Sequence, residues 1–186
     1  MMRGLQRAVR RAGLPVATSQ GFNPRPRIAI LQARGVGVSS EGELVEMDFE
    51  DWVGPQEVKR ALTAVLPDGI ELANVVLGNP RTHASVSNLT YRVDFAGGVS
   101  FSSEAIERLL DGSEILVERR RKGKIKTVNV RPVVDDVRVT HDSVIMTFKV
   151  TQQGSARPEE ILEALGMSRK DILSRCSITR TEMNLT

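Results

Sequence analysis

Hydrophobic and polar residues recur at helical spacing in the first twelve positions of the chain. The apolar side is formed by Leu5, Ala8, Val9 and Ala12. The opposite side carries the arginines Arg3, Arg7, Arg10 and Arg11. Gly13 is a natural helix terminator, so the pattern predicts an amphipathic helix that ends at this glycine. No N-cap residue precedes the helix, from which we expect a further N-terminal strand to be missing from this sequence.

Short runs with strand-like alternation make up much of the remaining chain. In 43–49, for example, hydrophobic residues alternate with Glu46 and Asp48, as in a half-buried strand. The predicted strands span residues 27–31, 43–49, 70–77, 89–95, 115–120, 125–130, 133–139, 144–150 and 177–185. Helices are predicted to begin near Pro55, Ser103, Pro158 and Ser168. The glycine-rich segment 35–40 is predicted as a turn or bulge.

The order of these elements indicates two similar halves. The second half runs strand, helix, strands, helix, strand, and the first runs helix, strand, strand, helix, strand. Adding one strand before Met1 would give both halves the split βαβ, or ferredoxin-like, order. The sequence therefore predicts an α+β protein of two tandem ferredoxin-like units with mainly antiparallel sheets, the first lacking its N-terminal strand. The units are predicted at 1–80 and 88–186, joined by the linker 81–87.

Composition limits the class of protein. The hydrophobic fraction of 40% is enough for a packed core, and the aromatic fraction of 4% makes that core mainly aliphatic. Cys176 is the single cysteine, which excludes an internal disulfide and favours a reducing compartment. No apolar run is long enough to cross a bilayer, and no signal-peptide core follows the first arginines. We therefore expect a soluble cytoplasmic protein without membrane contacts, and the oligomeric state stays open.

The connection between the first helix and the first predicted strand has unusual turn chemistry. It combines several glycines and prolines with Asn23 and two further arginines, Arg25 and Arg27. Gly21 is suited to a positive φ, and Gln20 and Asn23 offer side-chain amides. Such a loop can present N–H groups and cations to an anion.

Together, the helix and the loop define a candidate site for an anion or a nucleic acid. The candidate residues are Arg3, Arg7, Arg10, Arg25, Arg27, Gln20, Gly21 and Asn23. The net charge of +3 and the pI of about 9.3 are compatible with binding to nucleic acid. In one interpretation the helix arginines track phosphates. In the other, the arginines are a solvated helix face and the loop is a structural connection.

A second group of basic residues lies in the predicted hairpin, at 119–126. One interpretation is a basic hairpin that reaches an RNA groove, and the other is an exposed turn kept soluble by its charges. We prefer the exposed turn because no aromatic residue accompanies the cations there.

The remaining potentially reactive side chains do not indicate a catalytic site or a metal site. Neither His83 nor His141 has a nucleophile beside it, so no catalytic triad is expected. Asp135 and Asp136 are adjacent on a strand and face opposite sides, which disfavours a shared metal. Cys176 has no identifiable activating neighbour. We expect no catalytic residue, no metal and no cofactor.

Three stretches carry a family resemblance. They are residues 2–24, 122–132 and 154–160. Together they resemble the radical SAM-linked, or radical SAM-associated, protein family, a bacterial family of unknown function. The resemblance implies an accessory or substrate-presenting role beside a cobalamin-binding radical SAM enzyme, which would be the partner. Members often have His where this chain has Arg25, and Cys176 alone cannot form their partner's iron–sulfur motif, so the chain is not itself that catalyst.

Three functions stay open from the sequence. The leading hypothesis is a non-catalytic module that binds RNA or another phosphate-bearing ligand and accompanies a radical SAM enzyme. The second is an RNA-modifying or RNA-cleaving enzyme, which would need a general acid or base in its cleft and is supported only by analogy of fold. The third is a protein-docking domain, which would expose an apolar patch beside the loop.

Overall fold

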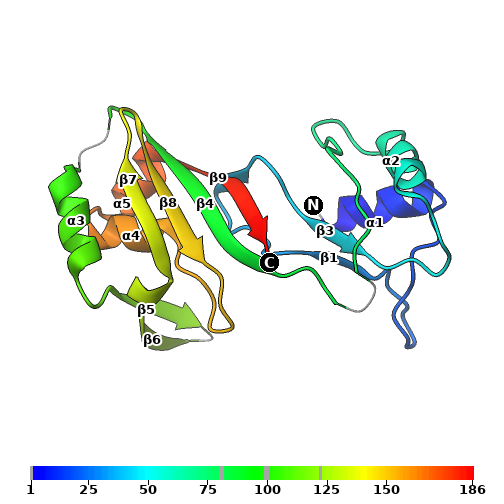
Figure 1. Cartoon of the computed structure of the whole chain (residues 1–186), viewed down its shortest axis with the longest axis horizontal. Helices are drawn as coiled ribbons and strands as arrows, with labels where there is room; N and C mark the ends of the chain where they lie inside the picture. Colours follow the sequence, from blue (N-terminus) through cyan, green and yellow to red (C-terminus); the bar gives the residue numbers. More distant parts are fainter. Residues whose placement is uncertain (1, 80–81, 99–100, 122) are drawn as a thin grey trace. The chain divides into compact units, whose positions relative to one another are not determined.

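A computed structural model describes residues 2–79, 82–98, 101–121 and 123–186, which form two compact units (Figure 1). The first unit comprises Met1–Ala33 and Glu43–Ala84, and the second comprises Arg34–Gly42 and Ser85–Thr186. The division predicted from the sequence keeps each unit continuous, whereas residues 34–42 lie with the second unit. Arg81 of the predicted linker and Lys122 of the basic hairpin fall outside the described residues.

The first unit packs two helices against a short antiparallel ribbon. Its elements are α1 (Met2–Arg11), β1 (Ile28–Ile30), β3 (Val45–Met47) and α2 (Pro55–Thr63). Its buried core consists of Val9, Val16, Val58 and Leu62. Val9, Val58 and Leu62 belong to the apolar faces that the sequence predicts for the two helices. Removing these aliphatic side chains from water is the main favourable contribution to the stability of this unit.

The strand predicted at 70–77 is wrong. This segment has no regular secondary structure. Leu72 and Val75 contact the core of the first unit, and a spacing of three places two residues on opposite faces of a strand. The side chain of Asn74 accepts a hydrogen bond from the N–H of Val75 at 2.9 Å, which competes with strand pairing. The ferredoxin-like arrangement of the first unit therefore stays a prediction.

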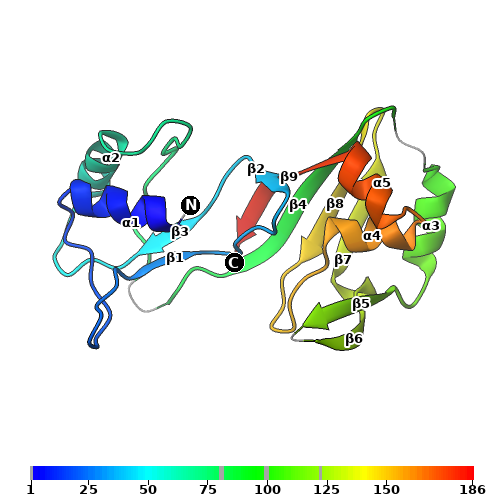
Figure 2. The same cartoon turned by 180° about the vertical axis from the view of Figure 1, so that it is seen from behind.

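The second unit is built on a five-stranded sheet of order β2-β9-β4-β8-β7. The strands are β2 (Val38–Ser40), β4 (Val86–Phe95), β7 (Val134–Val139), β8 (Ser143–Lys149) and β9 (Cys176–Leu185). The helices are α3 (Ser103–Asp111), α4 (Pro158–Ala164) and α5 (Arg169–Arg175), with a 3-10 turn at Arg131–Val133. Figure 1 shows α4 and α5 behind the sheet and Figure 2 shows them in front of it, so these helices cover one face.

The strand order of this sheet follows a split βαβ pattern. β8 is antiparallel to both of its neighbours, β4 and β7, and β4 is antiparallel to β9. The unit β4–α3–β7 is therefore split by β8, and the unit formed by β8, α4, α5 and β9 is split by β4. This order agrees with the arrangement predicted for the second half. The α+β class with mainly antiparallel sheets is confirmed.

The glycine-rich segment predicted as a turn or bulge forms a turn at Val36 and Gly37 and then contributes a strand. Its residues Val38–Ser40 form β2, which pairs in parallel with β9 and places Val38 opposite Ile178. Without β2, the outer edge of β9 would leave a row of backbone N–H and C=O groups unpaired. The partner strand lies at the other end of the chain, so the local glycine content could not reveal this pairing.

Alternation along the central strands decides which side chains are buried. Tyr91, Val93 and Phe148 lie on the helix-covered face and are at most 9% exposed, and the rings of Tyr91 and Phe148 are 5.8 Å apart. Thr90 and Arg92 lie on the other face, which the helices leave uncovered. The open face of β4 is therefore polar.

The basic hairpin forms as the sequence predicts. β5 (Leu116–Arg121) and β6 (Lys124–Asn129) make a separate two-stranded sheet between α3 and β7. Within the part of the chain that the structure describes, no helix is long and apolar enough to cross a membrane.

Candidate functional site

The helix α1 presents its arginines because its other side is held in the core. Ala8 and Val9 are 0% and 2% exposed, whereas Arg7 and Arg10, three residues apart, are exposed. Gly13 has a φ of +65°, a conformation that favours glycine, and its N–H bonds to the carbonyl of Arg10 at 3.3 Å to end the helix. The amphipathic pattern thus fixes the outward direction of the arginines.

One face of α1 forms a depression of about 330 Å³. Its lining consists of Arg3, Gln6, Arg7 and Arg10. These positions are three or four residues apart and therefore lie along one side of the helix. Among the described residues, none of the three arginines has an acidic partner within ion-pair distance. We call Arg3, Gln6, Arg7 and Arg10 the arginine face.

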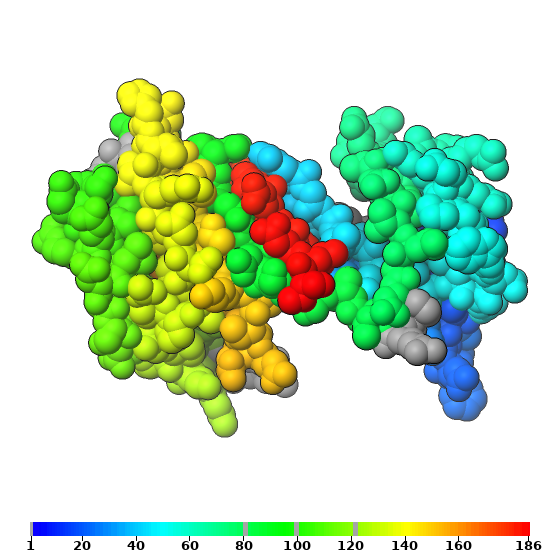
Figure 3. All heavy atoms as spheres, viewed as in Figure 1, coloured from blue at the N-terminus to red at the C-terminus, as the bar shows by residue number. Residues whose placement is uncertain are grey.

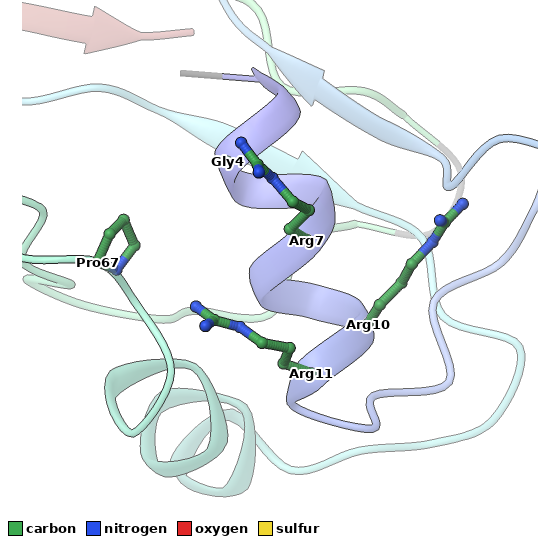
Figure 4. Close-up of a pocket in the computed structure, with 5 residues that line it drawn as sticks. All are labelled: Gly4, Arg7, Arg10, Arg11 and Pro67. Carbon is green, nitrogen blue, oxygen red and sulfur yellow. The ribbon is translucent and has the colours of Figure 1, made fainter.

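A second depression, of about 490 Å³, lies beside the first and shares Arg7 and Arg10 with it. Figure 4 shows the guanidinium groups of Arg10 and Arg11 on opposite sides of α1, with Arg11 directed toward Pro67. Arg11 donates a hydrogen bond to the carbonyl of Val65, just beyond the end of α2. Arg11 therefore ties α1 to the neighbouring segment, while Arg10 stays available to a ligand.

The loop after α1 is a closed hairpin. Thr18 and Pro26 form an isolated bridge, the N–H of Ser19 donates to the carbonyl of Arg25 at 2.8 Å, and the hydroxyl of Ser19 accepts from the N–H of Arg25 at 3.1 Å. Gly21 has a φ of +140°, which favours glycine there. The tip, residues 20–24, is exposed, and we call residues 18–26 the hairpin loop. Figures 1 and 2 show it projecting from the first unit.

The predicted site residues fall into two groups. Arg3, Arg7 and Arg10 line one depression, whereas neither depression includes a residue of the hairpin loop or Arg27. Arg27 lies 3.7 Å from a carboxylate oxygen of Asp48, and both side chains are about half exposed. The remaining candidates, Gln20, Gly21, Asn23 and Arg25, are exposed on the hairpin loop.

The binding residues predicted from the sequence did not include Gln6 or Phe22. Gln6 follows Arg3 by three residues, so the helical period could have identified it as part of the arginine face. Phe22 lies at the tip of the hairpin loop with its side chain fully exposed. Its position in a polar turn between Gly21 and Asn23 was the available signal, because a turn of this composition lies at the surface.

Charge is strongly concentrated at this end of the chain. The first 40 residues contain seven arginines, no lysine and no acidic residue. Since the whole chain carries +3, the remaining 146 residues carry a net charge of −4. Three of these arginines, Arg3, Arg7 and Arg10, have no acidic partner among the described residues, and such a local cluster attracts anions more strongly than the net charge suggests.

The other reactive groups are engaged in surface contacts. His83 lies 3.2 Å from Glu46, and His141 lies 3.6 Å from Asp142, its neighbour in sequence. No group of three or more His, Cys, Asp or Glu side chains able to hold a metal occurs among the residues that the structure describes. Cys176 is partly buried, and this burial raises the pKa of its thiol.

The basic hairpin is less available to a ligand than its composition indicates. Arg119 is directed inward and forms a bidentate ion pair with Glu160, with N–O distances of 2.7 and 2.8 Å. The hydrogen bond and the charge of Glu160 raise the pKa of Arg119. Arg120, Lys124 and Lys126 stay exposed.

Comparison with known proteins gives one match. A family model described as an uncharacterized protein conserved in bacteria (DUF2344) matches residues 1–158. No curated protein and no solved structure matches the chain.

Proposed function

The chain belongs to this bacterial family of uncharacterised proteins, DUF2344, and we propose that its first unit binds RNA through the arginine face of α1. The observation that carries the proposal is that three arginines at helical spacing on α1 line one depression and have no acidic partner among the described residues. Successive turns of a helix rise about 5.4 Å, a spacing comparable to that of phosphates along one nucleic-acid strand. Guanidinium groups bind phosphate oxygens through charge-assisted, often bidentate hydrogen bonds.

The lining of the two depressions favours binding over catalysis. It consists of arginines, Gln6, Gly4 and Pro67. None of these side chains can accept a proton near neutral pH, as a general base must. The amides of Gln20 and Asn23 and the guanidinium of Arg25 would add hydrogen bonds from the hairpin loop.

We further propose that the chain works as an accessory or substrate-presenting module beside a radical SAM enzyme. This part rests on the resemblance of residues 2–24, 122–132 and 154–160 to the radical SAM-linked family. In this role the chain holds the RNA while the partner performs the reaction. Co-purification of the tagged chain with such an enzyme supports this role, and a chain recovered without it under mild conditions counts against it.

Salt-dependent binding tests the RNA proposal. Each phosphate contact to a single strand contributes about −0.7 to the slope of log K against log salt concentration, so three arginines account for a slope of about −2. Fluorescence anisotropy with a labelled single-stranded RNA measures this slope. The variant R3A/R7A/R10A should weaken binding and reduce the magnitude of the slope by about 2.

A matched control separates this site from general cationic attraction. The variant R120A/K124A/K126A removes the same amount of charge from exposed positions of the basic hairpin. Its affinity and salt slope should stay close to those of the unmodified protein. Equal losses in the two variants, or binding that does not respond to salt, would overturn the proposal.

A further inference from the structure

Among the residues that the structure describes, exposed aromatic side chains occur only in the first unit. The chain has seven aromatic residues: five Phe, one Tyr and one Trp. Those that are at least partly buried are Phe49, Tyr91, Phe95, Phe101 and Phe148. The two that are exposed, Phe22 at 107% and Trp52 at 77%, both belong to the unit that carries α1.

Phe22 lies at the tip of a loop whose backbone is closed by hydrogen bonds. The bridge between Thr18 and Pro26 and the hydrogen bonds between Ser19 and Arg25 close the hairpin loop below its tip. A ring on such a closed loop loses less conformational freedom on binding than a ring on an open loop. The loop therefore displays an aromatic surface that no described residue covers.

The neighbours of the two exposed rings differ in charge. Phe22 is surrounded in sequence by Gln20, Asn23 and Arg25, which can bind base edges and phosphates. Trp52 directly follows Glu50 and Asp51, whose carboxylates repel phosphates. Charge complementarity with a nucleic acid therefore favours Phe22.

Given the RNA binding proposed above, we infer that Phe22 stacks on a base of the bound strand, and that the ligand is single-stranded RNA. The arginine face would hold the phosphates, and the ring of Phe22 would hold one unpaired base. Bases of a single strand are free to stack on aromatic side chains, whereas those of a duplex are stacked on one another. The unit that carries the arginine face also carries an exposed ring, and a single strand offers phosphates to the arginines and unpaired bases to the ring. This combination is why we infer a single-stranded ligand.

The open sheet face of the second unit does not offer the same chemistry. Sheets that bind single-stranded RNA present aromatic rings on their exposed strands. Here Tyr91 lies on the helix-covered face, and Thr90, Arg92 and Thr147 occupy the uncovered one. Arg92 is held by Asp94 at 3.2 Å and Glu41 at 3.3 Å. None of the described residues on this face is aromatic, so the face offers no ring on which a base could stack.

The test compares three labelled probes by fluorescence anisotropy. They are a single-stranded RNA of about 12 nucleotides, the same backbone without bases, and the corresponding duplex. The variant F22A loses one stacking contact, so its dissociation constant for the single strand should rise about fivefold or more. Its dissociation constant for the abasic strand should equal that of the unmodified protein. F22W should bind the single strand at least as well as the unmodified protein, and W52A is the matched aromatic control. Phe22 is fully exposed, so the circular dichroism spectrum of F22A should be unchanged.

The outcomes separate this inference from the proposed function. If F22A binds the single strand as tightly as the unmodified protein, or loses affinity for the abasic strand equally, the stacking role is refuted. If R3A/R7A/R10A still loses affinity for both probes in that case, RNA binding by the arginine face stands. If no probe binds in a salt-dependent way, both ideas fail.

Discussion

Replacing Arg119 with alanine removes the guanidinium that holds the hairpin β5–β6 against α4. Its Nε and Nη2 atoms donate to the two carboxylate oxygens of Glu160 at 2.7 and 2.8 Å, and Nη2 also donates to the carbonyl of Ser155 at 2.7 Å. Glu160 is 7% exposed, and its remaining hydrogen bond comes from the N–H of Arg157 at 3.0 Å. The variant R119A would therefore leave a buried carboxylate with most of its partners gone.

The expected loss follows from that burial. Breaking a buried ion pair by removing one partner costs about 3–5 kcal/mol, because the other charge stays in a poorly solvated place. The Arg119 side chain is 23% exposed, so water can replace part of the guanidinium and the lower end applies. A loss of about 3 kcal/mol at an m-value of about 2 kcal/mol per molar urea lowers the urea midpoint by about 1.5 M.

The two units supply separate signals for the measurement. Trp52, the single tryptophan, belongs to the first unit, and Tyr91, the single tyrosine, is buried in the second. Urea unfolding followed by the near-ultraviolet signal of Tyr91 should show the lower midpoint.

The matched control is the next residue along the strand. Arg120 is exposed, and R120A should change stability by less than about 0.5 kcal/mol. The double variant R119A/E160A should lose less than the sum of the two single variants, because neither charge then stays buried alone. A midpoint for R119A that equals that of R120A would refute this account of the ion pair.

Two further predictions concern the second unit. Burial raises the pKa of the Cys176 thiol, so iodoacetamide should alkylate it at pH 7 more slowly than a free cysteine and faster once urea has unfolded the chain; equal rates would contradict this. The hydroxyl of Ser102 caps α3 by accepting from the N–H of Ala105 at 3.3 Å, so S102A should lower the free energy of unfolding at pH 7 by about 1 kcal/mol. The hydrogen bond from Ser102 also lowers the pKa of Glu104, so its stabilising effect is present above the unfolded pKa and is lost as the pH falls through the folded one. The difference between the urea midpoints of S102A and the unmodified protein should therefore be smaller at acidic than at neutral pH, with the part due to the cap remaining, and an equal difference at both pH values would exclude this coupling.

Hydrophobic periodicity predicted the elements whose burial is decided locally. The helix α1 was predicted because Val9 and its apolar neighbours recur at 3.6-residue spacing, and the structure buries that side. The strand β2 could not be predicted, because its pairing with β9 is a tertiary contact between distant segments. Asn74 shows the reverse case, in which a side-chain hydrogen bond gives a hydrophobic segment an irregular backbone.

Arginines were the hardest residues to interpret from the sequence. Arg119 was grouped with the exposed cations of the basic hairpin, although alternation from the buried Val117 places it on the inward face of β5. Arg27 was grouped with the phosphate-binding cations. The pairing of Ile28 with Met47 brings Arg27 beside Asp48, and no local pattern predicts which strand supplies the neighbour.

A polyanion responds to charge that the protein leaves unneutralised, and here the two units differ. In the second unit, Arg92 binds Asp94, Arg138 binds Asp136 and Lys149 binds Asp135, at distances of 3.0 to 3.4 Å. The positive charges of these three side chains are therefore largely neutralised by the adjacent carboxylates. The arginine face of α1 has no described acidic partner and sits in a segment of 40 residues without a carboxylate side chain. The potential that attracts phosphates should therefore be strongest along the exposed side of α1, even though most of the chain's basic residues lie elsewhere.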